Sequence, residues 1–367
     1  MVARDLRRDR PRDMSDSTPA PRLLDLHPRD WPAWFEQRGA PGFQGRNAAR
    51  WVFRRGATSW EEMTDLPAGL RAQLEAEQPL ITAVCEARSE AEDGAVKLLL
   101  RLPDGASVEA VGMPGTMGRT LCLSSQVGCA VRCAFCASGM EGVERNLSRA
   151  EILEQALYLR REQGEFQRIV MMGMGEPGHN LDAVLAALDS LIDPEGMDFA
   201  ARRITLSTVG PKGALEQIAR WGKSINLALS VHAPDDTLRH ELVPGVRKRS
   251  LAETLDEADR LFAATGREYT VEYVLLAGVN DGNEQASALA AQLRGRRCHI
   301  NLIPYNPVPE FGFQRPELPD QEAFTARLRQ AGLSVTLRRS LGRQTDAACG
   351  QLRRRQRNSP PRPRFSA

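Results

Sequence analysis

From residue 119 onward the sequence alternates six times between strand-like and helix-like segments. Two of the helix-like segments begin with capping-box sequences, at Ser148/Glu151 and Ser250/Glu253. Such alternation predicts a parallel sheet with helical crossovers, which an open sheet, a full barrel or a partial barrel would each satisfy. The strand-like runs are TLCLSSQ, RIVMMGM, RITLSTV, INLALSV, YTVEYVLL and HINLIPY, followed by a further run, LSVTLRRS.

Polar, glycine-rich or cysteine-rich sequence follows these runs. The carboxyl ends of parallel barrel strands converge on one face of the molecule, where binding sites are built. We therefore predict an α/β fold, a partial (β/α)6 barrel, with its site at that face. The candidate residues at the strand ends are Cys129, Cys133, Cys136, Gly175, Glu176, Ser207, Ser230, Val231, His232 and Asn306.

The predicted barrel spans residues 115–350, and its flanks differ from it in composition. Residues 23–78 predict short helices of an accessory domain, and residues 79–114 predict a β segment with a turn at Pro103-Asp104-Gly105. Residues 1–22 and 351–367 are polar arms that we expect to be disordered. The second arm carries six arginines and no acid, so it either contacts RNA phosphates or stays solvated.

Basic and aromatic residues are interleaved in one of the accessory helices. An amphipathic helix that buries Trp51 and Phe53 beneath solvated arginines would give this pattern, and so would a surface that contacts RNA. The chain has few lysines, so its arginine clusters are weak evidence on their own. The interleaved residues are Arg46, Arg50, Trp51, Phe53, Arg54 and Arg55.

Composition places the chain among ordinary globular proteins. Its formal net charge is +2, and no apolar run is long enough to cross a membrane. The first residues lack an apolar signal core and include Asp5, Asp9 and Asp13, which argues against a targeting peptide. Seven cysteines are too few for a disulfide scaffold in a chain of 367 residues. We expect a cytoplasmic monomer with no membrane contact.

Three of the cysteines form a CxxxCxxC cluster, Cys129, Cys133 and Cys136. Zinc favours four ligands and paired CxxC knuckles, and the sequence has no second knuckle. Cys122, Cys298 or Cys349 could complete a zinc site only through the fold. Iron–sulfur clusters also bind Cys thiolates and normally take four, so three would leave one iron open to another ligand.

This spacing at the end of a first barrel strand resembles that of the radical S-adenosylmethionine (SAM) enzymes. The resemblance implies a [4Fe-4S] cluster on the three thiols, with SAM bound at the open iron and cleaved by one electron. The electron would come from a donor such as flavodoxin or ferredoxin. Gly175 and Glu176 resemble the motif for the SAM amino group. The further SAM contacts that we predict are Ser207, Ser230, Val231, His232 and Asn306.

A narrower resemblance covers about residues 40–352. Taken in order, the chain is similar to the RlmN/Cfr family of ribosomal-RNA adenine methyltransferases. The resemblance implies methylation of an adenosine in 23S rRNA, for which we predict carbon 2, with carbon 8 as the alternative and tRNA as a second candidate substrate. The blocks that carry it are TLCLSSQVGC, RNLS, MMGMGEP, ITLSTVGP, HAPDD, VEYVLLAGVND, NLIPYNP and DAACGQL.

The resemblance also implies a route that uses two SAM molecules per turnover. Cys349 would accept a methyl group from the first. The second would yield a radical that removes hydrogen from this methyl group, and the carbon radical would add to adenine. Glu109 would accept the ring proton, and Cys122 would release the product by forming a disulfide with Cys349. Cys85 and Cys298 match no motif and are predicted to be structural.

Some positions depart from the family pattern. Gln344 and Thr345 stand where an acidic and an aliphatic residue are usual, and Gly178 and His179 replace larger apolar residues. These departures bear on which carbon and which RNA are modified. A rival reading from another class is a zinc-stabilised RNA-binding module without catalysis. Anaerobically purified protein that is brown and holds about four irons would exclude that rival.

Overall fold

The computed structural model describes residues 22–116, 118–338 and 350–352. Cys349, Gln344 and Thr345 lie outside the described residues, as do nearly all of the two predicted arms. The described strands form a ten-stranded sheet in the order β1-β2-β3-β4-β7-β8-β9-β10-β11-β12 and a two-stranded sheet, β5-β6.

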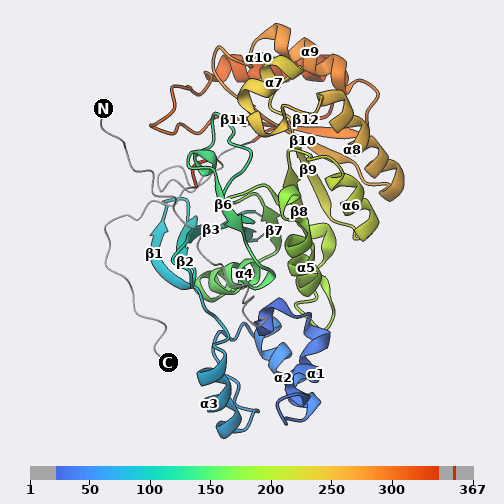
Figure 1. Ribbon diagram of the computed structural model, residues 1–367. Coiled ribbons are helices and arrows are strands. Elements are labelled where there is room, and N and C mark those ends of the chain that lie inside the picture. Colours follow the sequence, from blue (N-terminus) through green and yellow to red (C-terminus); the bar gives the residue numbers. More distant parts are fainter. Residues whose placement is uncertain (1–21, 117, 339–349, 353–367) are drawn as a thin grey trace, which may run out of the picture.

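The parallel part of the large sheet follows chain order from β4 to β12 (Figure 1). Each of the strand-like runs forms a strand, and the sheet is open between β1 and β12, so the predicted partial barrel is confirmed. Its strands are β4 (Thr120–Cys122), β7 (Arg168–Met171), β8 (Ile204–Thr208), β9 (Asn226–Ser230), β10 (Tyr269–Leu275), β11 (Cys298–Pro304) and β12 (Val335–Leu337).

Helices connect these strands, and Figure 1 shows α5, α6 and α8 side by side along the sheet. Both predicted capping boxes form, because Ser148 and Ser250 each exchange hydrogen bonds with the glutamate three residues later. The helices of this region are α4 (Arg149–Gln163), α5 (Leu181–Ile192), α6 (Ala214–Trp221), α7 (Asp236–Leu242), α8 (Leu251–Thr265), α9 (Asn283–Leu293) and α10 (Leu318–Gln330).

Three antiparallel strands extend the barrel sheet beyond β4. They are β1 (Val84–Glu90), β2 (Val96–Arg101) and β3 (Ser107–Met113). The predicted turn at residues 103–105 joins β2 to β3, whereas β1 is a strand that the sequence pattern did not single out. Since β3 pairs with β4, this extension brings residues 107–113 beside the first strand of the barrel.

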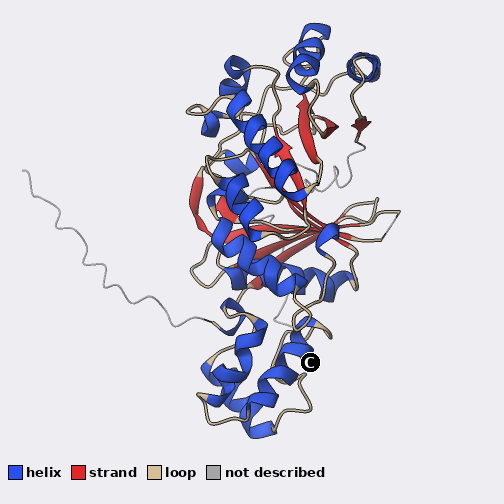
Figure 2. Ribbon diagram, turned by 90° about the vertical axis from the view of Figure 1, so that its right-hand side faces the viewer, coloured by secondary structure: helices blue, strands red, loops and turns tan. Residues whose placement is uncertain are grey.

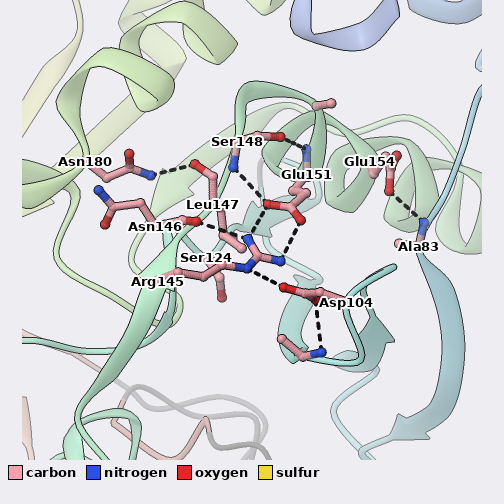
Figure 3. Close-up of polar contacts among 12 residues, drawn as sticks. Ala83, Asp104, Ser124, Arg145, Asn146, Leu147, Ser148, Glu151, Glu154 and Asn180 are labelled. Carbon is pink, nitrogen blue, oxygen red and sulfur yellow. Dashed lines mark hydrogen bonds and ion pairs between the residues drawn. The ribbon is translucent and has the colours of Figure 1, made fainter. Parts of the chain in front are cut away.

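A small hairpin carries the cysteine loop. It consists of β5 (Gln126–Gly128) and β6 (Val143–Asn146), and the loop lies between the two strands. Arg145 on β6 donates to both carboxylate oxygens of Glu151 on α4 (2.8 Å each) and to Asp104 in the β2–β3 turn (2.6 Å), as Figure 3 shows. The base of the loop is thereby fixed to the barrel on one side and to the antiparallel extension on the other.

The predicted N-terminal helices form a separate layer below the barrel (Figure 2). They pack around the buried aromatic side chains of Trp31, Phe35, Phe53 and Trp60. Arg160 on α4 fixes the layer by donating to the Phe53 carbonyl (2.9 Å). Its elements are the 3-10 turns Leu23–Asp25 and Pro28–Asp30 and the helices α1 (Trp31–Glu36), α2 (Gly42–Phe53) and α3 (Ala68–Glu77). Among the described helices none is long and apolar enough to span a membrane.

Candidate functional site

A cavity opens at the carboxyl ends of the parallel strands, the face that the sequence predicted. The three clustered cysteines border it together with residues that follow β7, β8, β9 and β11. The predicted site residues in its lining are Cys129, Cys133, Cys136, Gly175, Glu176, Ser207, Ser230, His232 and Asn306. The tertiary structure thus collects residues from an interval of about 180 positions into one cavity.

The cysteine loop is held by backbone contacts rather than by regular structure. Cys129 N–H donates to the Gly142 carbonyl (3.0 Å), and Ala134 N–H donates to the Leu242 carbonyl at the end of α7 (2.9 Å). Arg132 has a left-handed backbone, with φ 56°. A Cβ on Gly139 would lie 2.7 Å from the Arg132 Cα, so this position needs glycine. A strained loop that neighbours over-determine is typical of functional sites.

The three thiols fit a bound cationic group. The thiolate is the form that binds metal, yet burial raises the pKa of Cys129 to about 12. Burial also raises the pKa of Cys133 and of Cys136, and for Cys133 the two neighbouring thiols add to the effect. Such thiols lose their protons when positive metal ions bind to them. The donor set therefore suits metal ligation.

The spacing of these thiols suits a cluster better than a single ion. Within residues 22–116, 118–338 and 350–352, no three His, Cys, Asp or Glu side chains are placed to hold one metal ion. Zinc needs four donors at about 2.0–2.3 Å from one centre. A four-iron cluster binds each thiolate through a different iron, so its three ligands can border a cavity without converging on one point.

Glu176 is buried in the wall of the cavity, and hydrogen bonds from neighbouring residues hold its carboxylate in place. One oxygen accepts from Gly178 N–H (2.7 Å) and from the Thr208 hydroxyl, and the other accepts from Val209 N–H (2.9 Å). Burial raises the pKa of Glu176 in spite of these bonds. Gly175, just before it, has φ 99°, and a Cβ there would lie 2.6 Å from the Gln126 backbone nitrogen. Glycine is therefore required for the close approach of this loop to β5.

The strand-end serines lie together, but their neighbour Val231 faces elsewhere. The hydroxyl oxygens of Ser207 and Ser230 are 3.4 Å apart at the ends of β8 and β9. Val231 packs into the core and is not part of the cavity lining, although its N–H donates to the Glu272 carbonyl (3.0 Å). Asn306 is buried in the cavity wall.

His232 is a neutral imidazole in this structure. Burial and, to a smaller degree, the charge of Arg239 lower its pKa to about 3. Its Nδ1 accepts from Val274 N–H (3.2 Å), which leaves the proton on Nε2. Its backbone is left-handed (φ 61°), and Asn280 holds the carbonyl with a side-chain hydrogen bond of 2.8 Å. The Phe135 ring packs edge-on against the imidazole, 5.1 Å between centroids.

The end of the described chain returns to the cysteine loop. Gly350, which follows Cys349 in the sequence, lines the cavity, and its carbonyl accepts from Ala137 N–H (2.8 Å). The Leu352 carbonyl accepts from the Ser138 hydroxyl (2.8 Å). These two contacts fix residues 350–352 against residues more than 200 positions earlier.

Glu109 and Cys122 do not line this cavity, although both are buried. Paired residues on neighbouring strands point to the same face of a sheet. Cys122 pairs with Val111 on β3, and Glu109 lies two residues before Val111. Lys97 on β2 also pairs with Val111, and its ammonium lies 2.9 Å from the Glu109 carboxylate. Lys97, Glu109 and Cys122 therefore share one sheet face.

That face continues into the interior of the barrel. Val170 on β7 pairs with Cys122, and Val170 lines a second hollow inside the barrel near the amino ends of the strands. Met172 and Glu272 line both this hollow and the cavity at the carboxyl ends. Cys122 and Glu109 thus face the same barrel interior as the predicted cofactor residues, but at a different level along the barrel axis.

Sequence reasoning missed the groups that support the site, which are side chains and, for Val209, the backbone N–H. Thr208 and Val209 hold Glu176, Asn280 holds His232, and Lys97 pairs with Glu109. Asn280 follows the fifth strand run in the sequence, where a site residue could have been sought. Lys97 is one of few lysines in a chain rich in arginine. Its rarity was the other feature of the sequence that could have marked it as a candidate site residue.

Two family models match the chain. The model of the radical SAM superfamily matches residues 123–290. The model described as ribosomal RNA large subunit methyltransferase N-terminal domain matches residues 22–79, the helical layer below the barrel.

Similar proteins cover almost the whole chain. The Rhodopirellula baltica protein named probable dual-specificity RNA methyltransferase RlmN is 48% identical over 88% of this chain and 87% of its own length. The protein of the same name from Pelotomaculum thermopropionicum is 45% identical over 86% of this chain and 87% of its own. The crystal structure of a radical SAM methyltransferase from Sphaerobacter thermophilus superposes with a TM-score of 0.88, at 41% identity over 91% of this chain and 99% of that one.

Proposed function

Because the chain belongs to the RlmN family of radical-SAM RNA methyltransferases, we propose that it methylates carbon 2 of an adenosine in 23S rRNA. A tRNA adenosine is the second substrate that we propose, since the relatives are named dual-specificity enzymes. The observation that carries the proposal is the cavity in which the cysteine triad, Gly175 and Glu176 meet the chain that follows Cys349.

Three thiols, Cys129, Cys133 and Cys136, would hold the [4Fe-4S] cluster. When bound, the cluster and SAM supply a methyl group and, after one-electron cleavage of SAM, a radical that removes hydrogen. The electron would come from a flavodoxin- or ferredoxin-like donor. Glu176 would accept a hydrogen bond from the SAM ammonium, and Ser207, Ser230, His232 and Asn306 would hold the rest of SAM. The further side chains that border the same space include Phe135, Val209 and Tyr305.

Cys349 carries the methyl group in the proposed route. Its sulfur forms a bond to the methyl carbon as the sulfonium of the first SAM releases that carbon. After loss of one hydrogen atom, the same carbon bonds to carbon 2 of adenine, which joins protein and RNA covalently. The contact of Gly350 with the cysteine loop supports this assignment, because Gly350 directly follows Cys349 in the sequence.

Glu109 and Cys122 complete the reaction. Glu109 would accept the proton that leaves carbon 2 while the unpaired electron of the adduct returns to the oxidised cluster, and the Cys122 thiolate would then attack the Cys349 sulfur. The S–S bond forms as the S–C bond breaks, and the released carbon takes up a proton to become the product methyl group. The contact between Lys97 and Glu109 supports the base role, because a nearby ammonium favours the ionised carboxylate.

Part of the accessory layer is suited to contact RNA. Phe43, Arg46 and Arg50 lie at helical spacing on α2, and all three are exposed, Phe43 by 52%. An exposed ring between guanidinium groups can stack on a base while the charges meet phosphates. The other interleaved residues are engaged within the protein. Phe53 is buried, Arg54 donates to the Pro194 carbonyl (2.6 Å), and Arg55 stacks on Trp51.

Mass spectrometry of RNA tests the proposal most directly. The reduced holoenzyme is incubated anaerobically with SAM and with protein-free 23S rRNA or tRNA, and the nucleosides are then analysed. We expect 2-methyladenosine. Adenosine methylated at carbon 8 would replace our assignment with the other branch of the family, and unmodified RNA with a fully loaded cluster would overturn the proposal.

Two variants examine the thiol roles in the same assay. Cys349→Ala should lose methyl loading of the protein, because the accepting sulfur is gone. Cys122→Ala should load methyl normally and accumulate a covalent protein–RNA adduct, visible as a band that nuclease treatment shortens. Free methylated RNA from Cys122→Ala would remove Cys122 from the route.

A further inference from the structure

A fully buried arginine lies next to the cysteine loop, and part of its guanidinium has no hydrogen-bond partner within the described residues. Arg239 on α7 has no exposed surface, and its Nη2 donates to the Val209 carbonyl (2.9 Å). Its Nε and Nη1 have no hydrogen-bond partner among the described residues. Of the two acids on the same helix, Asp236 and Glu241, Asp236 accepts from Leu251 N–H (2.6 Å), and its charge opposes part of the fall in the pKa of Arg239.

This arrangement is unfavourable for the protein alone. An isolated charge in a protein interior costs several kcal/mol unless an opposite charge compensates it. Burial lowers the pKa of Arg239 to about 10, so the guanidinium still carries its charge at neutral pH. Arg249, which also lies near the cavity, differs because it pairs with Glu257 and donates to the Gly210 carbonyl. An anion that balances Arg239 is therefore expected nearby in the functional protein.

The surroundings of Arg239 indicate where that anion lies. The carbonyl at the end of its helix, that of Leu242, accepts from Ala134 N–H in the cysteine loop, between Cys133 and Cys136. Gly245 N–H donates to the Val131 carbonyl (2.9 Å), and a Cβ on Gly245 would lie 2.7 Å from the Val131 Cα. The loop therefore packs closely on the α7 segment. A charge on Cys133 would interact favourably with the guanidinium.

We propose that Arg239 is the fixed counter-charge of the iron–sulfur cluster and its thiolates, and that it raises the reduction potential of the cluster. This inference rests on the cluster of the proposed function. Reduction adds one electron from an external donor and therefore one negative charge to the cluster, with no bond made or broken. A fixed cation stabilises the reduced state more than the oxidised state, because attraction grows with the charge. Low dielectric around a buried group strengthens the effect.

Arg239 is a positioning residue in this proposal, since it acts on the cluster without ligating it. The hydrogen bond from Nη2 to the Val209 carbonyl keeps the guanidinium beside Val209, which lines the cavity. The same charge lowers the pKa of His232 and so helps to keep that imidazole neutral. The charge on α7 thus affects two parts of the cavity wall.

The test is a potentiometric titration of the reconstituted holoenzyme, followed by electron paramagnetic resonance, without SAM or RNA. Arg239→Met should bind the cluster and shift its oxidised-to-reduced ratio at a set potential at least about tenfold toward the oxidised form, which equals about 59 mV for one electron. Arg239→Lys, which keeps a charge, should recover most of the shift. Arg160→Met serves as a control, because Arg160 joins α4 to the accessory layer and is not among the residues that line the cavity.

Each outcome separates this inference from the proposed function. Wild-type protein that binds no iron would overturn both. Loaded Arg239→Met with an unchanged potential would overturn the inference alone. If Arg239→Met does not fold, Arg239→Gln and Arg239→Lys are compared, and equal potentials in these two variants would also overturn it.

Discussion

The two ends of the barrel differ in how their polar groups are satisfied. At the amino ends, His299 contacts Ser334 and Thr336 at 2.8 and 3.0 Å, and Asn226 donates to the Arg202 carbonyl at 2.8 Å. At the carboxyl ends, the thiols border a cavity, and two nitrogens of Arg239 have no hydrogen-bond partner in the part of the chain that the structure describes. Polar groups that form hydrogen bonds with one another stabilise a fold. Buried polar groups without such partners call for an explanation, and a bound ligand is one.

The backbone conformation is a second point of comparison between the two ends of the barrel. The described non-glycine residues with left-handed backbone are Arg132, Asp198 and His232. Arg132 and His232 belong to loops at the carboxyl ends, whereas Asp198 lies between α5 and the start of β8. Residues at the amino ends of the strands follow regular parallel pairing, for example Thr270 with His299. The two strained residues at the carboxyl ends border the cavity region, where strained backbone is typical of functional sites.

Replacing one cysteine at each end should give the largest contrast. Cys133→Ala removes a proposed cluster ligand, so we expect loss of the brown colour, most of the iron and all RNA methylation. Cys298→Ala changes a buried cysteine at the start of β11 and should keep iron and activity within about twofold. Iron content, absorbance and methylation of 23S rRNA are measured for both. A colourless Cys298→Ala variant would show that the amino end takes part in cluster binding.

Breaking the Lys97–Glu109 pair should give the next largest effect. Lys97→Met leaves a buried carboxylate without its ammonium, so the protonated form is favoured and less of the carboxylate is free to accept the ring proton. Methyl loading of Cys349 should persist, while release of RNA from the covalent adduct slows by about tenfold or more. The rate of release should also become half-maximal at a higher pH. Quenched time courses between pH 6 and 9, resolved by gel electrophoresis, measure both quantities.

Two variants control this experiment. Lys97→Arg keeps the charge and should restore much of the rate. Arg101→Met removes an ion pair to Glu86 on the same face of β2, at a more exposed position. The charged and titratable side chains that share this face near Glu109 include Lys97, Arg101, Cys122 and Arg168. Equal slowing in Lys97→Met and Arg101→Met, with no change of pH profile, would mean that Lys97 has a structural role only.

Glu272, where the two hollows meet, should affect stability rather than chemistry. Burial raises its pKa from 4.5 to about 7, although Arg338 and Asn301 oppose the shift. Between these values the folded state holds a proton that the unfolded state has lost, so stability falls as pH rises through this window, by up to about 3 kcal/mol. Glu272→Gln should remove that decline. Urea unfolding of anaerobic holoprotein at pH 5 and pH 8 measures it, and parallel pH curves for variant and wild type would refute the expectation.

The smallest effect is expected for the amino end alone. Thr336→Ala removes a hydroxyl that contacts His299 at an exposed site, so it should cost about 0.5–1.5 kcal/mol or less of stability. Methylation should stay within about twofold of wild type, because the residue lies at the opposite end of the strands from the thiols. A loss of activity larger than the loss of folded protein would end the distinction between the two ends.

Much of the fold follows from sequence periodicity. Each strand-like run became a strand, and both capping boxes formed where Ser and Glu stand three apart. The strand β1 was not singled out, since VCEARSE has no clear alternation and only its pairing with β2 makes it a strand. Patterns of this kind are local, so a sequence can display them without any knowledge of the tertiary fold.

The site divides in the same way. The cysteine spacing and Gly175-Glu176 are local signals, and the sequence located them. The SAM contact of Val231 stays a prediction, and the sequence could not show that its side chain packs into the core, because the direction of a side chain at a strand end depends on how the loop leaves the sheet. The hydrogen-bond partner of Glu176 lies 32 positions away in the sequence, and that of His232 lies 48 positions away. No local sequence pattern predicts such pairs.

The sequence by itself determined the family and the alternation of parallel strands with helices. It also determined the three thiols, which leave the fourth ligand position of a metal cluster open. The tertiary structure decided that Lys97 faces Glu109 and that Arg239 is buried behind the cysteine loop, with two nitrogens that lack a hydrogen bond within the described residues. Hydrophobic periodicity and ligand spacing are properties of neighbouring residues along the chain. The pairing of buried charges depends on which distant segments share a low-dielectric interior, and only folding brings those segments together.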